Sequence, residues 1–194
     1  MLLAVTGWSR ALALHKAAKI PPALAAEVTL GNSLSRKNHR IHILCHRQCA
    51  GKRSLFQVEK IARLFIAIMF AHRAKKKFLL HEFVVMPDHF HLILTPTGIT
   101  LERAMQLVKG GFSFQLNRAL KSKRDPWQPS FFDRRIRNSL EYQKYKDYIW
   151  QNPVKRGLAR TPEEYPYSSA NPAFTLDPVP QRLKPLALRA LPQG

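Results

Sequence analysis

Apolar residues in the central part of the chain recur with two different periods, which predict strands and helices. Residues Ile41 to Cys45 form a short apolar alternation typical of a strand. From Val58 to about Lys75 the apolar residues recur at three- and four-residue steps, which predicts a helix with one buried face. Two further strands are expected from Phe78 to Met86 and from His89 to Thr95. Because only two residues separate them, these strands should form a tight hairpin.

The second half of this region continues the alternation of strands and helices. A helix is expected from Leu101 to Leu120, although Gly110 and Gly111 should weaken it. The segment Trp127 to Ile136 is aromatic and basic, and its pattern fits a strand or a loop. A last helix is expected from Ser139 to Gln151, ended by Pro153 because proline lacks the backbone donor. This order predicts an α/β (α+β) fold in which helices cover a central, mainly antiparallel sheet.

Both ends of the chain differ in composition from this central region. Residues 1 to 34 are rich in Ala and Leu and contain a single acidic residue, Glu27, so they are expected to form a loosely ordered extension. Residues 171 to 194 are punctuated by proline, which predicts a flexible tail. The expected folded domain therefore spans residues 35 to 170.

The charge of the chain indicates a polyanionic partner. Lys and Arg number 32 against 12 Asp and Glu, which gives a formal net charge of +20. A ribosome-type structural protein or a basic membrane-surface protein would also fit this charge. The 45% hydrophobic content argues against a disordered polycation. Because the chain has no secretory pattern and no long apolar run, we expect a soluble cytoplasmic protein without membrane contact.

The two cysteines do not predict a disulfide framework. Cys45 and Cys49 are four residues apart, with His42 and His46 nearby. Because all four residues lie in one short basic stretch, with no further ligands at zinc spacing, a structural zinc site is disfavoured.

The triplet His89, Phe90 and His91 is the most informative feature of the predicted strands. Successive strand side chains alternate between the two faces, so both imidazoles should point to one side and Phe90 to the core. Such a pair fits metal ligands, general bases or polar surface residues. The apolar residues on both sides favour a buried pair, where unpaired imidazoles would be costly.

Three tyrosines at three-residue steps lie on the last predicted helix. Only Tyr148 is followed one turn later by a carboxamide, Asn152, which would place a hydroxyl and an amide oxygen on one face. For Tyr142 and Tyr145 the residues at the same offset are Lys146 and Ile149. Packing in the core should explain at least one of the three tyrosines.

Several spaced segments resemble one family. The run from Val85 to Leu92 resembles the signature of the single-tyrosine HUH transposases, in which a hydrophobic residue separates two histidines. The resemblance continues through 127 to 137 and 148 to 158, and ends at 165 to 169. Together these segments, spread over roughly residues 38 to 170, look most like the REP-associated tyrosine transposases.

The resemblance implies a role for each site residue and a reaction. His89 and His91 correspond to the metal-binding pair, Asn152 to the third ligand, and Tyr148 to the nucleophile. The implied cofactor is Mg²⁺ or Mn²⁺, and the implied substrate is single-stranded or hairpin DNA, cleaved and rejoined through a 5′-phosphotyrosine. The family also implies a ferredoxin-like palm, and a monomer or a homodimer.

Basic and aromatic residues are expected to contact the nucleic acid. Exposed aromatic rings can stack on unpaired bases, but core packing is an equal alternative for Trp127, Phe131 and Phe132. The residues assigned to phosphate contacts are Lys121, Lys123, Arg124, Arg134, Arg135, Arg137, Lys155 and Arg156.

Two other classes of protein compete with this interpretation. A non-catalytic DNA-binding protein, including an inactive transposase descendant, would explain the charge but would give His89, His91, Tyr148 and Asn152 no shared purpose. A non-haem iron enzyme would use the two histidines, but the usual carboxylate is missing from the helix position.

Overall fold

The computed structural model describes residues 54–121, 123, 125–127, 133–180 and 183 in full, and residues 41–47 and 132 by their backbone alone. Single 3₁₀ turns lie at Leu55–Gln57 and Pro162–Glu164. The longer elements are β1 (Ile41–Arg47), α1 (Glu59–Ala74), β2 (Phe78–Val85), β3 (His89–Pro96), α2 (Leu101–Leu120), β4 (Phe132–Ile136) and α3 (Ser139–Lys155). The segment that fitted a strand or a loop thus contains β4.

The four strands form one antiparallel sheet in the order β2-β3-β1-β4. β1 and β2 are both antiparallel to β3, so they run parallel to each other with β3 between them. The succession β-α-β-β-α-β in this order is the ferredoxin-like arrangement, which confirms the predicted fold class.

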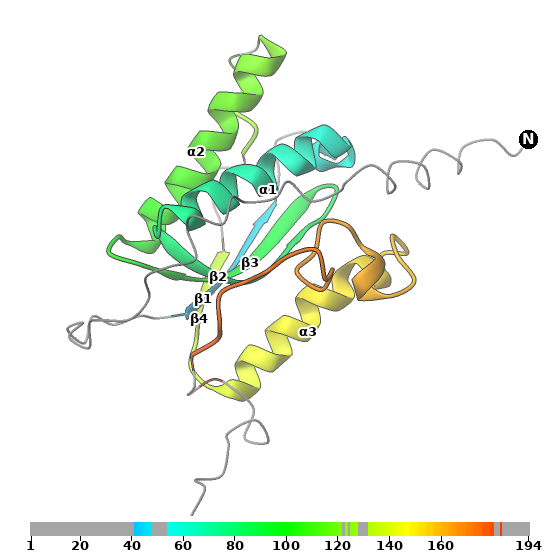
Figure 1. The fold of residues 1–194 in the computed structure, drawn as a ribbon. Helices are drawn as coiled ribbons and strands as arrows, with labels where there is room; N and C mark the ends of the chain where they lie inside the picture. Colours follow the sequence, from blue (N-terminus) through cyan, green and yellow to red (C-terminus); the bar gives the residue numbers. More distant parts are fainter. Residues whose placement is uncertain are drawn as a thin grey trace, which may run out of the picture. The chain divides into compact units, whose positions relative to one another are not determined.

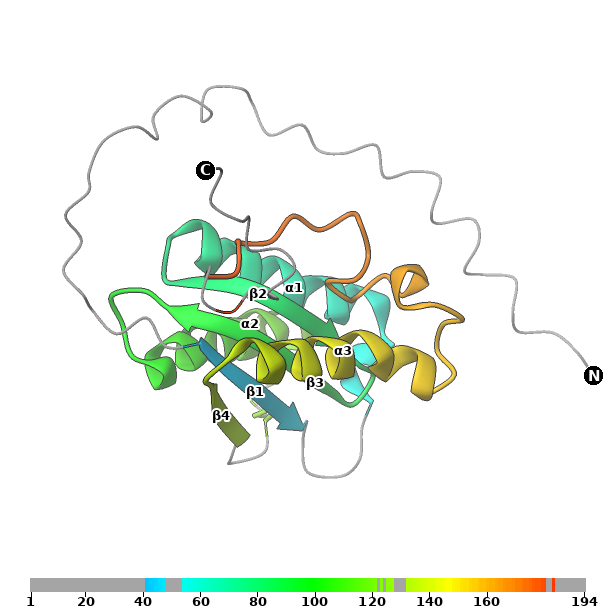
Figure 2. The same cartoon turned by 90° about the horizontal axis from the view of Figure 1, so that it is seen from below.

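Helices cover both faces of the sheet, and the predicted His89 and Tyr148 site lies on the face that α3 covers. In Figure 1, α1 and α2 lie on one side of the strands and α3 lies on the other. Figure 2 shows α3 running across the sheet in a view from below. Between the sheet and the first two helices the core is aromatic, with Phe65 packed on Phe90 at 4.7 Å between ring centroids. This core packs against the face of β3 that carries Phe90, and α3 covers the opposite face.

The pair of glycines does not interrupt α2. The helix runs unbroken from Leu101 to Leu120, contrary to the expected weakening. A Cβ atom at Gly111 would approach Ile68 Cγ2 to 3.2 Å, so the missing side chain lets α1 and α2 pack closely. Tertiary packing therefore offsets the low helix propensity of glycine.

Pro153 does not end α3, so the predicted end near Gln151 was wrong. The helix continues to Lys155 with Pro153 in its last turn. Proline there removes only one helical hydrogen bond. The end is closed by the Arg156 and Leu158 amides, which donate to the carbonyls of Asn152 and Pro153 at 3.2 and 2.9 Å. Asn152 therefore remains within the helix, one turn after Tyr148.

β2 is the edge strand of the sheet, but residues 165–177 cover that edge. The Val85 amide donates to the Tyr167 carbonyl at 2.9 Å, and the Ser169 amide donates to the Phe83 carbonyl at 2.8 Å. Covering the edge satisfies backbone groups that would otherwise be exposed. β2 therefore has backbone partners along its outer edge as well as on β3.

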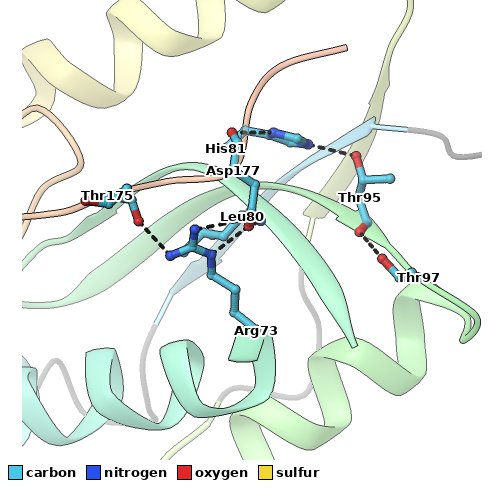
Figure 3. A network of polar contacts seen from close by, with 7 residues as sticks. All are labelled: Arg73, Leu80, His81, Thr95, Thr97, Thr175 and Asp177. Carbon is cyan, nitrogen blue, oxygen red and sulfur yellow. Dashed lines mark hydrogen bonds and ion pairs between the residues drawn. The ribbon is translucent and has the colours of Figure 1, made fainter. Parts of the chain in front are cut away.

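A polar network holds the end of this segment (Figure 3). Arg73, from the end of α1, donates to both carboxylate oxygens of Asp177, at 2.6 and 3.1 Å. The Leu80 amide also donates to Asp177, at 2.8 Å. Burial alone would raise the pKa of Asp177, but these donors lower it below its ordinary value. The tail predicted to be flexible from residue 171 is therefore bonded to β2 as far as Asp177.

Within the described part of the chain, no helix is both long and apolar enough to cross a membrane.

Candidate active site

β3 presents both histidines to the face of the sheet that α3 covers. The rings of His89 and His91 lie 4.9 Å apart between centroids and are nearly perpendicular. Phe90, between them, points to the opposite face and packs against Phe65. Both imidazoles are buried. The placement expected from strand alternation is therefore confirmed.

α3 brings the predicted tyrosine to this pair. The ring of Tyr148 lies 5.1 Å from that of His91, at an interplanar angle of 81°. Tyr148 is 45% exposed, whereas Asn152, one turn later, is buried at 8%. The site thus combines a solvent-accessible phenol with buried imidazoles.

A charged pair borders His89. Asp88 Oδ1 lies 2.7 Å from His89 Nδ1 and accepts a hydrogen bond from Arg156 Nη1 at 3.0 Å. Burial by itself would raise the pKa of Asp88, but its bonds to His89 and Arg156 lower it, so the carboxylate stays charged. A neutral His89 bonded to this carboxylate carries its proton on Nδ1 and its lone pair on Nε2.

His91 is buried without a hydrogen bond to either ring nitrogen from any residue that the structure describes. Burial, followed by the electrostatic effect of the neighbouring His89 and Arg156 side chains, lowers the pKa of His91 to about 3. The ring is therefore neutral at physiological pH and keeps a lone pair. A buried polar group without a partner is costly, and a bound ion would offset that cost at His91.

These donors suit a divalent cation. Neutral imidazoles bind many divalent metals, and an amide oxygen such as that of Asn152 suits Mg²⁺ and Mn²⁺. Groups of three or more His, Cys, Asp or Glu side chains placed to share a metal are absent from the described residues. A site here would therefore need a ligand of another type, and Asn152 on α3 is the residue predicted for that role.

The other two tyrosines of α3 have different surroundings. Tyr142 is buried and donates its hydroxyl to Glu82 Oε1 at 3.0 Å. Burial and the charge of Glu82 raise the pKa of Tyr142 above its ordinary value, which disfavours the phenolate. Tyr145 lies beneath the Arg134 guanidinium, 6.0 Å from the ring centroid. Only Tyr148 is in ring contact with the histidines.

Glu82 was missed by the sequence analysis. Besides Tyr142 it accepts hydrogen bonds from Trp150 Nε1 at 2.8 Å and from Ser169 Oγ at 2.7 Å. It therefore ties α3 to β2 and to the segment that covers β2. The available signal was an acidic residue within the apolar run from Phe78 to Met86.

The predicted phosphate-contacting residues do not form one cluster. Lys121 caps the C-terminal end of α2, the helix that lies on the other side of the sheet from α3, and Lys123 lies in the segment after that helix. Arg134 and Arg156 lie on the α3 side, beside Tyr145 and Asp88 respectively. Arg124 lies outside the described residues. The described members of the set, all exposed, are Lys121, Lys123, Arg134, Arg135, Arg137, Lys155 and Arg156.

Trp127 belongs to the core and is not available for stacking on a base. It is buried and packs on Phe112 at 5.1 Å between centroids. Its indole N–H lies within hydrogen-bond distance of the Lys109 carbonyl, at 3.0 Å, and Ser113 Oγ, at 2.8 Å. The alternative of core packing therefore holds for Trp127. Phe131 and the side chain of Phe132 lie outside the described residues.

Known proteins resemble this chain in sequence and in fold. The family model described as "Transposase IS200 like" matches residues 35–152. The chain is 31% identical over 96 residues to the REP-associated tyrosine transposase of Escherichia coli K12. That match covers 48% of this chain and 55% of the relative, so it spans about half of the relative's length.

A solved structure has the same fold. It is a REP-associated tyrosine transposase bound to a REP hairpin, with a TM-score of 0.57 and 22% sequence identity. The match covers 80% of this chain and 95% of that one.

Proposed function

Because the chain belongs to the family of IS200-like transposases, we propose that it cleaves and rejoins single-stranded DNA with Tyr148 as the nucleophile. The contact between Tyr148 and His91 carries this proposal. It places an accessible phenol against a buried, neutral imidazole whose nitrogens have no hydrogen-bond partner among the described residues.

The reaction exchanges one phosphodiester for another. The Tyr148 oxygen loses its proton and attacks phosphorus, and the bond to the 3′ oxygen breaks. That oxygen takes up a proton and leaves as a 3′-hydroxyl, while the 5′ phosphate remains on Tyr148. A second 3′-hydroxyl can then attack this phosphotyrosine and release the phenol, so no nucleotide cofactor is needed.

His89, His91 and Asn152 would hold the divalent cation, Mg²⁺ or Mn²⁺. When bound, such an ion acts as a Lewis acid toward the scissile phosphate. Asp88 orients the His89 ring through Nδ1, and Arg156 keeps that carboxylate charged and in place. Arg156 is itself exposed and can also approach a phosphate oxygen of the substrate.

Hairpin DNA with a single-stranded flank is the substrate that we propose. The structurally similar transposase is bound to a REP hairpin. A strand outside a duplex can bring its phosphate to Tyr148, and the excess of positive charge favours any DNA backbone. The contact of Tyr148 with His91 of the same chain supports a site assembled within one monomer.

Covalent trapping tests the proposal. A hairpin oligonucleotide labelled at its 3′ end should form an adduct with the protein that survives denaturing electrophoresis. Tyr148→Phe should abolish the adduct and leave DNA binding intact, because only the nucleophilic oxygen is removed. Tyr145→Phe, one turn away on α3, is the matched control and should remain active.

The outcomes separate the competing functions. An adduct that persists in Tyr148→Phe would show that another residue is the nucleophile. A protein that binds the hairpin in the presence of Mg²⁺ or Mn²⁺ but forms no adduct would be a DNA-binding protein without catalytic activity.

A further inference from the structure

The C-terminal half of α2 carries an exposed aromatic side chain that no core contact explains. Phe114 is 65% exposed, whereas its neighbours Phe112 and Leu116 are buried. In Figure 1 this half of the helix extends past α1, away from the sheet. Single exposed apolar side chains are common on protein surfaces, so the groups around Phe114 decide whether it has a binding role.

Two cations follow Phe114 toward the end of α2. Arg118, four residues later, lies on the same face of the helix, and Lys121 is the left-handed C-cap that ends it. Both cations are exposed. Between Glu102 and Asp125 the chain has six Lys and Arg residues and no acidic residue. An anionic partner is therefore favoured over an apolar one.

Gly110 continues the same face one turn before Phe114. A Cβ atom there would have no neighbour within 4 Å, so packing does not require glycine at this position, in contrast to Gly111. An exposed glycine inside a helix costs about 1 kcal/mol relative to alanine. Because Gly110 has no side chain, space stays open beside Phe114. A flat group such as a nucleic-acid base could enter that space.

We propose that this strip of α2, formed by Gly110, Phe114, Arg118 and Lys121, binds a single-stranded segment of DNA. An unpaired base stacks on Phe114, and the adjoining phosphates contact Arg118 and Lys121. The strip lies on the side of the sheet opposite Tyr148, so it holds a part of the substrate other than the scissile phosphate. This inference rests on the proposed function for its substrate class.

Binding without cleavage tests the strip directly. Affinities are measured in a chelator for two DNAs, a hairpin with a single-stranded flank and a closed dumbbell of the same stem and loop, which has no flank. Phe114→Ala should weaken binding of the flanked hairpin by about fivefold or more and leave the dumbbell within about twofold, because base stacking contributes roughly 1–3 kcal/mol. An unchanged affinity for the flanked hairpin would overturn the proposal.

Leu120→Ala is the matched control. Leu120 is 58% exposed on the same helix but lies on a different face. Its replacement should leave both affinities within about twofold, because it removes apolar area without removing a stacking partner. If Leu120→Ala weakened binding of the flanked hairpin as much as Phe114→Ala does, the effect would come from a general change in α2. That result would overturn the proposal.

Gly110→Leu separates a binding role from a structural one. The substitution should preserve or raise the melting temperature, because leucine favours a helix and a Cβ atom at this position meets no neighbour within 4 Å. It should nevertheless weaken binding of the flanked hairpin by filling the space beside Phe114. Higher stability with unchanged affinity would contradict the assignment of that space to a base.

The salt dependence identifies the phosphate contacts. Arg118→Gln and Lys121→Gln should each reduce the log-log salt slope for the flanked hairpin by about 0.7. If Phe114→Ala instead dissociates an oligomer in sedimentation and leaves DNA affinity unchanged, the strip is a contact between copies of the chain and the proposal fails.

The outcomes also separate this proposal from the proposed catalytic function. An adduct at Tyr148 without any flank-dependent effect of Phe114 would refute the strip alone. A flank-dependent effect without an adduct would keep the strip as the binding surface of a DNA-binding protein and refute the catalytic proposal.

Discussion

Replacing Glu82 with leucine removes the carboxylate that joins α3 to β2 and to residues 165–177. The buried carboxylate accepts bonds from Tyr142, Trp150 and Ser169, at 3.0, 2.8 and 2.7 Å. Each donor left unsatisfied inside a protein costs about 1–3 kcal/mol, and hydrogen bonds to charged groups lie at the upper end. Because neighbouring losses are not additive, we expect Glu82→Leu to lower the free energy of unfolding by about 3–5 kcal/mol.

The assay is thermal or denaturant unfolding of the full chain. For a chain of this size the expected loss corresponds to a fall in melting temperature of roughly 6–20 °C. Glu82→Gln should cost less, about 1–2 kcal/mol, because the amide oxygen still accepts hydrogen bonds. Asp147→Asn is the control, since it alters an exposed carboxylate on the same helix and should change stability by less than about 0.5 kcal/mol.

The same substitution should slow cleavage. Tyr148 lies on α3 between Tyr142 and Trp150, which both bond to Glu82, so the carboxylate limits how the helix can rotate on the sheet. Single-turnover cleavage by Glu82→Leu is measured well below its melting temperature and corrected for the fraction of protein that is folded. The corrected rate should be lower than that of the unaltered chain, with DNA affinity nearly unchanged. A stability change below about 0.5 kcal/mol would refute the reasoning, because three buried donors would then have lost nothing.

Three further predictions concern the site and the ion pair of Figure 3. His89→Ala and His91→Ala should each eliminate cleavage across a series of Mg²⁺ and Mn²⁺ concentrations, and full activity of either variant in a chelator would remove the metal mechanism. Mixing Tyr148→Phe with His91→Ala should not restore cleavage, because the two residues meet within one chain; recovery on mixing would indicate that the helix is exchanged between subunits. The lowered pKa of Asp177 stabilises the fold above the unfolded value of about 3.9, and this contribution is lost as the pH falls through the lower folded value. Unfolding of Asp177→Asn should therefore depend less steeply on acid pH than that of the unaltered chain, and parallel curves would contradict the role of the Arg73 pair.

The sequence predicted most of the strands and helices because their apolar periods are strong. The hairpin boundaries came out within one residue, since strand alternation is interrupted only by Pro87 and Asp88. The errors concern Gly111 and Pro153, which lie inside helices although both residue types have a low helix propensity. Close packing of two helices stabilises the first position, and the second lies in a last turn where a single hydrogen bond is lost.

The candidate site was predictable where the evidence is local. The shared face of His89 and His91 follows from strand geometry, and the relation of Tyr148 to Asn152 follows from the helical turn. The approach of Tyr148 to His91 was supplied by family resemblance, because no local pattern specifies how a helix lies on a sheet. Glu82 escaped prediction because its donors are 60, 68 and 87 residues away in sequence.

The structural unit that supports the site extends beyond the region matched by the family model. That match ends at residue 152, yet residues 165–177 bond to the edge of β2, and Ser169 shares Glu82 with α3. Val84, paired with His91 on one side, forms a bridge with Ser168 on the other. A chain ending at residue 160 should therefore expose the β2 edge, leave Glu82 short of a donor and melt at a much lower temperature, with a tendency to aggregate.

A chain ending at residue 183 is the control for this truncation. It keeps residues 165–177, the Arg73 to Asp177 pair and the buried Leu183, so its melting temperature should match that of the full chain. Both forms retain Tyr148, His89 and His91. A difference in cleavage rate between them must then come from the loss of residues 165–177, which hold β2 and α3 in position. If the chain ending at 160 melted within a few degrees of the control and cleaved hairpin DNA at the same rate, the covering segment would contribute nothing to the position of α3.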